Sequence, residues 1–220
     1  VQTESETVEY AADGSIARRS ERKDGVLNGK LVQYSAPNTV SAISHYLDGK
    51  LDGTTEYYEN GRATMTLQFR DDLQDGEQVL RDAEGWVAQR AQFKAGMLDG
   101  EFVQYGAPDV VSAVMQYQSG KLEGPAEFYE NGRMRMATRY RDGVQDGETL
   151  LYDDLGNLTS RAEYKAGKLD GTSLLYRLDG SVLRSMQYVE GMLDGELVEY
   201  DERGRVKERT LYRANAKVSK

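Results

Sequence analysis

A single motif, Gly-x-Leu-Asp-Gly, recurs along almost the whole chain at a fixed spacing. Full copies end at Gly53, Gly100, Gly171 and Gly195, and looser copies complete the series. The glycines that close the motif are residues 29, 53, 76, 100, 124, 147, 171 and 195, which lie 23 or 24 residues apart. A period of this length is the signature of a repeat protein, in which each repeat packs against its neighbours.

Each repeat has the pattern of two strands. An aromatic residue stands five positions after most closing glycines: Tyr34, Tyr58, Tyr105, Tyr129, Tyr152, Tyr176 and Tyr200. A turn signal follows, most clearly at Asn60-Gly61 and Asn131-Gly132, because Asn-Gly favours the two-residue turn of a β-hairpin. The second strand ends in another aromatic residue: Tyr46, Phe69, Phe93, Tyr117, Tyr140, Tyr164, Tyr188 and Tyr212. We therefore predict an all-β chain whose repeat is a strand, a tight turn, a second strand and a glycine-bounded loop.

A longer period lies on top of the short one. Gln33–Pro37 matches Gln104–Pro108, and Tyr58–Arg62 matches Tyr129–Arg133. Both pairs of segments are 71 residues apart, which is the length of three repeats. This spacing indicates that a block of three repeats was duplicated.

The same repeats define the expected domain boundaries. We predict a repeat domain over residues 8–213, made of about eight hairpin units after a degenerate first unit. Residues 1–7 are expected to form a frayed N-terminal tail and residues 214–220 a C-terminal tail. The repeats that contain Pro37 and Pro108 are expected to have longer turns.

The turn at Asn60-Gly61 predicts which side chains share a face of the sheet. An unbroken ladder through this turn pairs Tyr58 with Ala63 and Glu56 with Met65, and paired residues lie on one face. Alternation along the strands then predicts an aromatic face and a polar face. The aromatic face would hold Tyr58, Ala63, Met65, Leu67 and Phe69, and the polar face Tyr57, Glu59, Arg62, Thr64, Thr66 and Gln68.

Four residues depart from this pattern. Glu56 and Glu127 stand where other repeats have Val or Leu, and Arg81 stands where others have an aromatic residue. These charges either reach water from an open rim of the sheet or meet opposite charges on a partner. Trp86, on the polar face, either covers a neighbouring strand or anchors an interface, where tryptophan is enriched.

Composition narrows the classes of partner. The formal net charge is −9, from 37 acidic and 28 basic residues that are interspersed. Nucleic-acid binding needs clustered Lys and Arg, and an anionic membrane would repel the chain, so neither partner is expected. A protein with a basic contact surface is the electrostatic complement. The chain has no cysteine, and no apolar run approaches the ~20 residues of a transmembrane helix.

No arrangement of residues indicates catalysis or metal binding. The single histidine, His45, has Gln116 as its counterpart, which is typical of a solvated strand position. No nucleophile elbow, phosphate-binding loop or dinucleotide fingerprint is present. The Asp-Gly pairs lack the spacing of calcium loops, and tight turns favour Asp before Gly. We therefore predict a protein that is not an enzyme and that holds no metal ion or cofactor.

The segment Asp52–Gly61, with the sequence Asp-Gly-Thr-Thr-Glu-Tyr-Tyr-Glu-Asn-Gly, resembles the MORN repeat. It is similar to the variant found in bacterial YwqK-like antitoxin proteins, and the resemblance covers about residues 8–213. The repeats of Pro37 and Pro108 depart from that pattern. The resemblance implies an elongated, twisted single-layer sheet of successive antiparallel hairpins. It also implies an antitoxin or immunity protein that neutralises a toxin by binding it.

Three hypotheses for function follow. The first is a bacterial immunity protein that occludes a cognate toxin or secreted effector without chemistry. The second is a structural scaffold that self-associates, with a homodimer formed through aromatic faces or open edge strands. The third is association with lipid or a membrane. The first residue, Val1 instead of Met, favours an exported, periplasmic protein, with a cytoplasmic protein as the alternative.

A bound toxin is expected to contact the aromatic face, because a single layer leaves that face uncovered. The predicted partner-binding residues are Glu56, Tyr58, Phe69, Arg81, Trp86, Phe93, Tyr105, Met115, Tyr117, Glu127, Tyr129 and Tyr140.

Overall fold

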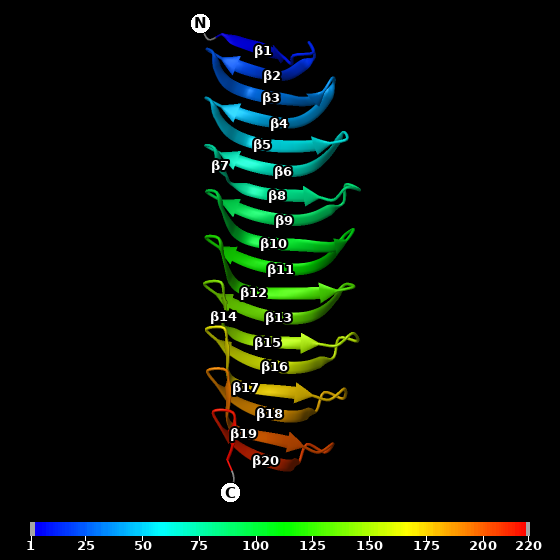
Figure 1. Ribbon diagram of the computed structural model, residues 1–220, viewed down its shortest axis with the longest axis vertical. Coiled ribbons are helices and arrows are strands. Elements are labelled where there is room, and N and C mark those ends of the chain that lie inside the picture. The colour runs from blue at the N-terminus through cyan, green and yellow to red at the C-terminus, as the bar shows by residue number, and fades with distance from the viewer. Residues whose placement is uncertain (1–2, 219–220) are drawn as a thin grey trace. The chain divides into compact units, whose positions relative to one another are not determined.

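A computed structural model describes residues 3–218, which form 21 β-strands and no helix. Two compact units divide the chain, the first ending at Asp109 and the second beginning at Val110. Within each unit, consecutive strands lie side by side and antiparallel, and tight turns join them at alternate ends (Figure 1).

The first unit is a sheet in which strands pair in the order of the chain, with β7 and β8 both paired to β6. Its strands are β1 (Glu4–Tyr10), β2 (Ile16–Lys23), β3 (Val26–Ala36), β4 (Thr39–Leu47), β5 (Lys50–Glu59), β6 (Arg62–Arg70), β7 (Leu73–Gln74), β8 (Gly76–Arg81), β9 (Val87–Lys94) and β10 (Met97–Ala107).

The second unit repeats this plan, with β14 and β15 both paired to β13. Its strands are β11 (Val110–Gln118), β12 (Lys121–Glu130), β13 (Arg133–Arg141), β14 (Val144–Gln145), β15 (Gly147–Tyr152), β16 (Leu158–Lys165), β17 (Lys168–Tyr176), β18 (Val182–Val189), β19 (Met192–Tyr200), β20 (Val206–Arg213) and β21 (Ala216–Lys217).

The prediction of an all-β, single-layer antiparallel sheet of hairpins is confirmed in each unit. The strands extend further at both ends than expected. β1 begins at Glu4, inside the stretch predicted to be a tail, and β21 pairs Ala216 with Arg213. Residues 1–2 and 219–220, which complete the two predicted tails, lie outside the described residues.

The expected glycine-bounded loop is a two-residue turn followed directly by strand. In the copy that ends at Gly171, the turn consists of Ala166 and Gly167, with φ of 48° and 79°, and β17 begins at Lys168. Two successive residues with positive φ are typical of the type I′ turn, whose twist matches that of a hairpin. Successive hairpins are therefore linked by further hairpins.

The remaining motif positions tie neighbouring repeats together. Leu169 lies opposite Tyr164, and Gly171 lies opposite Tyr188, the aromatic residue of the next strand. The Asp170 carboxylate accepts a 3.1 Å hydrogen bond from the backbone N–H of a residue in the next turn. The same position accepts such a bond at Asp52, Asp75, Glu123, Asp146 and Asp194. Each copy of the motif therefore binds to the next repeat through strand pairing and a carboxylate hydrogen bond, which explains why the motif recurs.

The turn at Pro37 is shorter than expected. Ala36 pairs directly with Thr39, so Pro37 and Asn38 form a two-residue turn, with Asn38 at a φ of 60°. Proline presets the first central position of such a turn, and asparagine tolerates the left-handed second position.

A β-bulge shifts the register behind the hairpin tip of β5 and β6. Tyr58 pairs with Ala63, as an unbroken ladder requires, but Tyr57 pairs with Met65. Thr64 is therefore the extra residue, and its hydroxyl donates a 3.3 Å hydrogen bond to the carbonyl of Tyr57. A bulge of one residue moves every later residue of its strand to the other face relative to the partner strand.

This register makes the predicted faces wrong. Glu56 lies opposite Thr66 and not Met65. Glu56 and Tyr58 therefore share one face of the sheet, and Phe69 lies on the other face. A 2.8 Å hydrogen bond from the Tyr58 hydroxyl to the Glu56 carboxylate agrees with this arrangement. The two aromatic series therefore lie on opposite faces, one formed by first strands and the other by second strands.

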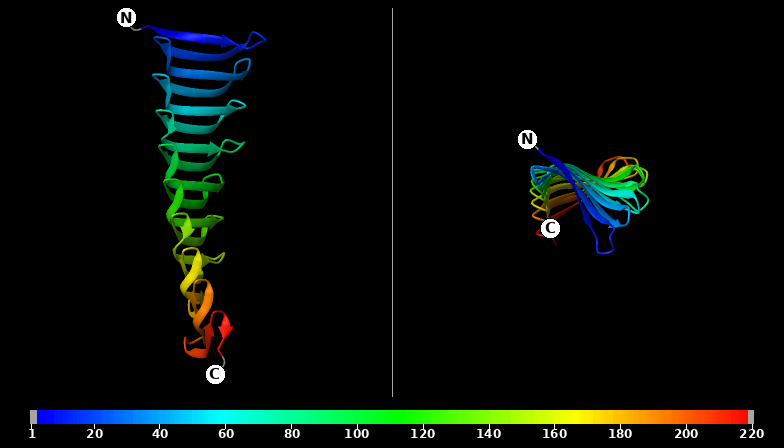
Figure 2. Two further views of the ribbon diagram at one scale, coloured as in Figure 1. Left: turned by 60° about the vertical axis from the view of Figure 1, so that its left-hand side comes forward. Right: turned by 90° about the horizontal axis from the view of Figure 1, so that it is seen from above.

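We call the two faces inner and outer. The inner face carries the second-strand aromatic residues and the buried row of Ser20, Leu31, Ala42, Ser44, Thr55, Leu67 and Ala91 in the first unit, and Ala113, Ala126, Thr138, Thr149, Ala162 and Ser173 in the second. The other buried residues of the described chain, Val79 and Val198, lie on the outer face. In a single-layer sheet, a small side chain is buried only where larger side chains of neighbouring residues cover it. Such cover forms on the concave side of bowed strands, and the strands are visibly bowed (Figure 2).

Candidate functional site

The inner face is uncharged over most of each unit. From β3 to β10, and from β11 to β17, the inner-face positions between the two ends of the strands hold no Asp, Glu, Lys or Arg. Charged residues make up 30% of the chain, and within these strands they lie instead on the outer face and in the turns. Ion pairs such as Arg90 with Glu77, 2.8 Å apart, run along the outer face. Over these strands the inner face therefore consists of aromatic, aliphatic and uncharged polar side chains.

Part of the inner face of the first unit remains exposed. Tyr57 lies opposite Met65, and Met65 lies opposite Leu80, so three large apolar side chains stand side by side on β5, β6 and β8. Tyr57 is 39% exposed, and the other two are half-buried. We call these three residues the first inner patch.

The duplication gives the second unit an equivalent cluster. Phe128 lies opposite Met136, and Met136 lies opposite Leu151, each 71 residues after its counterpart. Leu151 is 41% exposed. We call these three residues the second inner patch. Two independent copies of the same apolar arrangement are available for contact.

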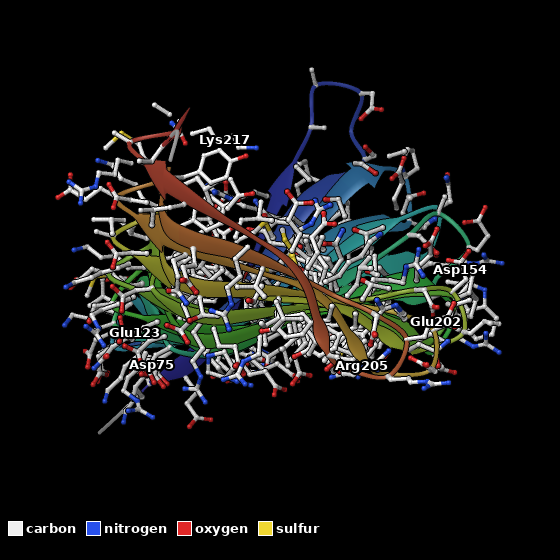
Figure 3. The ribbon with its side chains drawn as sticks, turned by 90° about the horizontal axis from the view of Figure 1, so that it is seen from below. Asp75, Glu123, Asp154, Glu202, Arg205 and Lys217 are labelled. Carbon is white, nitrogen blue, oxygen red and sulfur yellow. The ribbon has the colours of Figure 1, made fainter. Side chains whose placement is uncertain are left out.

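Charged turns border the inner face at both ends of the strands. The motif edge holds the turns of the recurring motif, and the tip edge holds the turns within each repeat. In the second unit, Glu123 lies at the motif edge, and Asp154, Glu202 and Arg205 lie at the tip edge, at opposite ends of the strands (Figure 3). An uncharged face with an apolar patch between charged borders resembles a protein interface, which has an apolar core and a polar rim.

Aspartates fix the conformation of the longer turns at the tip edge. The Asp153 carboxylate accepts hydrogen bonds from the side chain and the backbone N–H of Asn157 and from the N–H of Leu155. These bonds favour the charged form and hold the pKa of Asp153 below its usual value, the Asn157 side chain contributing most. Asp201 is held in the same way by Arg205 and Arg203. The tip edge is therefore a row of ordered turns.

The two glutamates singled out by the sequence lie on the outer face and are hydrogen-bonded. Glu56 accepts from the hydroxyl of Tyr58 at 2.8 Å, and Glu127 accepts from Tyr129 at 2.5 Å. The hydrogen bond to the carboxylate, with some burial, raises the pKa of Tyr129 to about 12, and the pKa of Tyr58 is raised for the same reasons. Each carboxylate thus fills a hydrophobic position by pairing with a tyrosine of its own strand.

The structure does not bring the predicted partner-binding residues together. The outer face holds Glu56, Tyr58, Arg81 and Tyr105 in the first unit, and Glu127 and Tyr129 in the second. The inner face holds Phe69 and Phe93 in the first unit, and Met115, Tyr117 and Tyr140 in the second. Trp86 lies in a tip-edge turn and is 51% exposed.

Sequence reasoning missed both inner patches because it placed Tyr57 on the polar face. The signal for the bulge was present in the residue count. Seven positions separate Gly53 from Asn60, whereas eight separate Gly61 from Phe69. Because Gly53 and Phe69 lie opposite one another, the longer side must contain an extra residue.

The described residues contain no group of three or more His, Cys, Asp or Glu placed to hold a metal ion. In the same part of the chain, no helix has the length and apolar composition needed to cross a membrane.

Comparison with protein-family models and with curated proteins gives no match for this chain. The resemblance to MORN repeats therefore rests on the repeated residues quoted above.

Proposed function

We propose that this chain is a non-enzymatic immunity protein that neutralises a toxin or secreted effector by covering it. The uncharged inner face carries the proposal, because it is a broad surface with exposed aromatic and aliphatic side chains on a chain rich in charge. Occlusion requires only a complementary surface, and the resemblance to YwqK-like MORN proteins supplies the class of partner.

The two inner patches are the proposed centres of contact. Interfaces derive most of their affinity from a few buried aromatic and large apolar residues, surrounded by contacts that exclude water. Tyr57 and Leu151 are the most exposed members of their patches and are suited to that role. The partly buried aromatic rows beside them would form the surrounding contacts.

Affinity capture followed by a rescue assay tests this function. The chain is used as bait with a lysate of the source cell, and a stoichiometric partner is then expressed alone and together with the chain. The proposal expects toxicity from the partner alone and growth when both are present. Recovery of the chain alone, with a mass that rises with concentration, would instead establish a self-associating scaffold.

Substitutions on the inner face locate the contact. Tyr57→Glu and Leu151→Glu each place a charge at a partly exposed position, and together they should abolish capture while the repeats stay folded. Leu178→Glu is the matched control, because Leu178 is 78% exposed in the turn between β17 and β18 and belongs to neither patch. Glu56→Lys with Glu127→Lys probes the outer face. Loss of capture with the outer-face pair alone would move the contact to that face.

A further inference from the structure

Exposed carboxylates stand beside the first inner patch. Glu59 follows Tyr57 by two residues on the same strand, and Asp82 and Glu84 lie in the turn between β8 and β9. All three are exposed, and none forms an ion pair with another described residue. Arg62, which lies opposite Glu59, donates instead to the backbone carbonyl of Glu84 at 3.1 Å. Asp82 Oδ1 accepts the backbone N–H groups of Glu84 and Trp86, so its negative charge has a fixed place in the turn. The carboxylates of Glu59 and Glu84 are free to meet cations from outside.

The second unit differs at the corresponding tips. Its counterpart of Glu59 is the ion-paired Glu130, and its counterpart of Glu84 is Leu155. Glu130 and Asp154 both contact Arg135, whose Nε lies 3.1 Å from Glu130 Oε2 and whose Nη1 lies 2.5 Å from Asp154 Oδ1. Arg135 is the extra residue of the bulge, and Thr64 holds that position in the first unit. Arg135 thus neutralises the counterpart of Glu59, and the first unit has threonine in place of this arginine.

The two units also differ in an exposed aromatic residue and in their balance of charge. Trp86, 51% exposed in the tip-edge turn of the first unit, corresponds to Asn157 in the second. The first unit carries 19 acidic and 11 basic residues, whereas the second carries 18 and 17. The first unit alone combines an apolar patch, an exposed indole and an acidic border.

We propose that the first inner patch and its tip edge bind an amphipathic helix whose apolar stripe is flanked by lysine or arginine. This inference deepens the proposed function, on which it rests, by naming the element of the partner that is recognised. Strands lie about 4.8 Å apart and helical turns about 5.4 Å apart, so a helix that crosses the strands presents one apolar residue per turn to Tyr57, Met65 and Leu80.

Electrostatic attraction adds to the apolar contact. Basic residues on the flank of that helix facing the tip edge come within reach of Glu59, Asp82 and Glu84. Trp86, in the same turn as the last two, offers a ring face to a lysine or arginine side chain. The second inner patch lacks this border, so it is not expected to bind a basic helix with comparable affinity.

Two synthetic peptides of about 14 residues, each made only of leucine and lysine, test the proposal on the full chain. One places leucine at helical spacing along a single stripe, and the other has the same composition in an order that destroys the stripe. Emission of Trp86, the sole tryptophan, reports binding. We expect a saturable change with the first peptide, about tenfold tighter than with the second, and weakened by added salt.

An exchange of bulge residues supplies the matched control. Thr64→Arg supplies the first unit with the arginine that neutralises the second, and should weaken binding of the striped peptide by about three- to tenfold. Arg135→Thr makes the reverse change in the second unit and should leave the affinity unchanged.

Equal binding of both peptides, or equal affinity of the Thr64→Arg variant and the wild type, would overturn the proposal. Absence of peptide binding by a chain that still captures and neutralises a partner would also overturn it, while leaving the proposed function in place.

Discussion

Tyr57 lies directly opposite Met65, one residue beyond the partner that an unbroken ladder would give it. That step puts Tyr57 on the inner face with Met65 and Leu80 and leaves Tyr58 on the outer face, bonded to Glu56. The first inner patch therefore exists because β6 contains one residue more than β5 on its side of the turn. A single extra residue therefore decides which of two adjacent tyrosines lies on the inner face, where a partner could contact it.

Replacing Thr55 with valine should stabilise the first unit. Thr55 is 2% exposed, lies between Ser44 and Leu67 on the inner face, and its hydroxyl oxygen has no hydrogen-bond partner among the described residues. A buried hydroxyl without a partner costs free energy, and valine has nearly the same shape. We expect Thr55→Val to raise the free energy of unfolding by about 1 kcal/mol, measured from urea denaturation.

Thr149→Val is the control with the opposite sign. The Thr149 hydroxyl lies 2.7 Å from that of Thr138 and accepts a 2.7 Å hydrogen bond from the side-chain amide of Gln145. Removing it takes one hydrogen bond from each of these partners, which keep the 3.0 Å bond from Gln145 to Thr138, so this variant should lose about 1 kcal/mol. A lower urea midpoint for Thr55→Val than for the wild type would show that the Thr55 hydroxyl is bonded after all.

The repeat made the strands, their order and the fold class predictable, because the period and the Asn-Gly turns are local signals. The assignment of side chains to the two faces was predictable only where the strands pair without a bulge. The bulge at Thr64 reversed the placement of Tyr57 and Tyr58, since a shift of one residue exchanges the two faces. Sequence alone therefore identified an aromatic face but assigned the wrong members to it.

The contacts of individual charges were not visible in the sequence. Glu56 and Glu127 were expected either to reach water or to meet opposite charges on a partner, and the structure adds that each is bonded to a tyrosine two residues further along its strand. Glu59 forms no ion pair with another described residue, whereas its counterpart in the second unit, Glu130, is paired with Arg135. This difference between the units could be recognised only from the structure.

Asp170→Ala should loosen the link between two repeats. The Asp170 carboxylate accepts the backbone N–H of Glu190, and a hydrogen bond to a charged group contributes about 1.5–3 kcal/mol. Because the bond is exposed, we expect a loss of about 1 kcal/mol in the free energy of unfolding, with faster amide exchange at Glu190. Asp170→Asn keeps an acceptor and should lose less. Equal stability of the alanine variant and the wild type would limit the motif aspartate to turn formation.

Gly76→Ala tests why a glycine closes each motif. Gly76 has a φ of +122°, and an added Cβ would lie 2.8 Å from the Cβ of Gln68 on the neighbouring strand. Strain and overlap should together cost about 2–3 kcal/mol. Gly132→Ala is the matched control, because Gly132 has a φ of +75° and no atom within 4 Å of the added Cβ, so only the left-handed backbone costs about 1 kcal/mol. Similar melting temperatures for the two variants would remove the close approach as a cause.

Stability should fall in strong alkali partly through Tyr129. Its hydrogen bond to Glu127 raises the pKa from 10.0 to about 12, so the folded state holds the phenolic proton more tightly than the unfolded chain. This contribution is fully present below about pH 10 and is lost as the pH rises through about 12. Urea denaturation across this range should show a smaller loss for Tyr129→Phe, and absorbance at alkaline pH should show one late-titrating phenol fewer. In Glu127→Gln the partner is neutral, so Tyr129 should titrate nearer its ordinary value. An unchanged titration in that variant would assign the raised pKa to burial and not to the carboxylate.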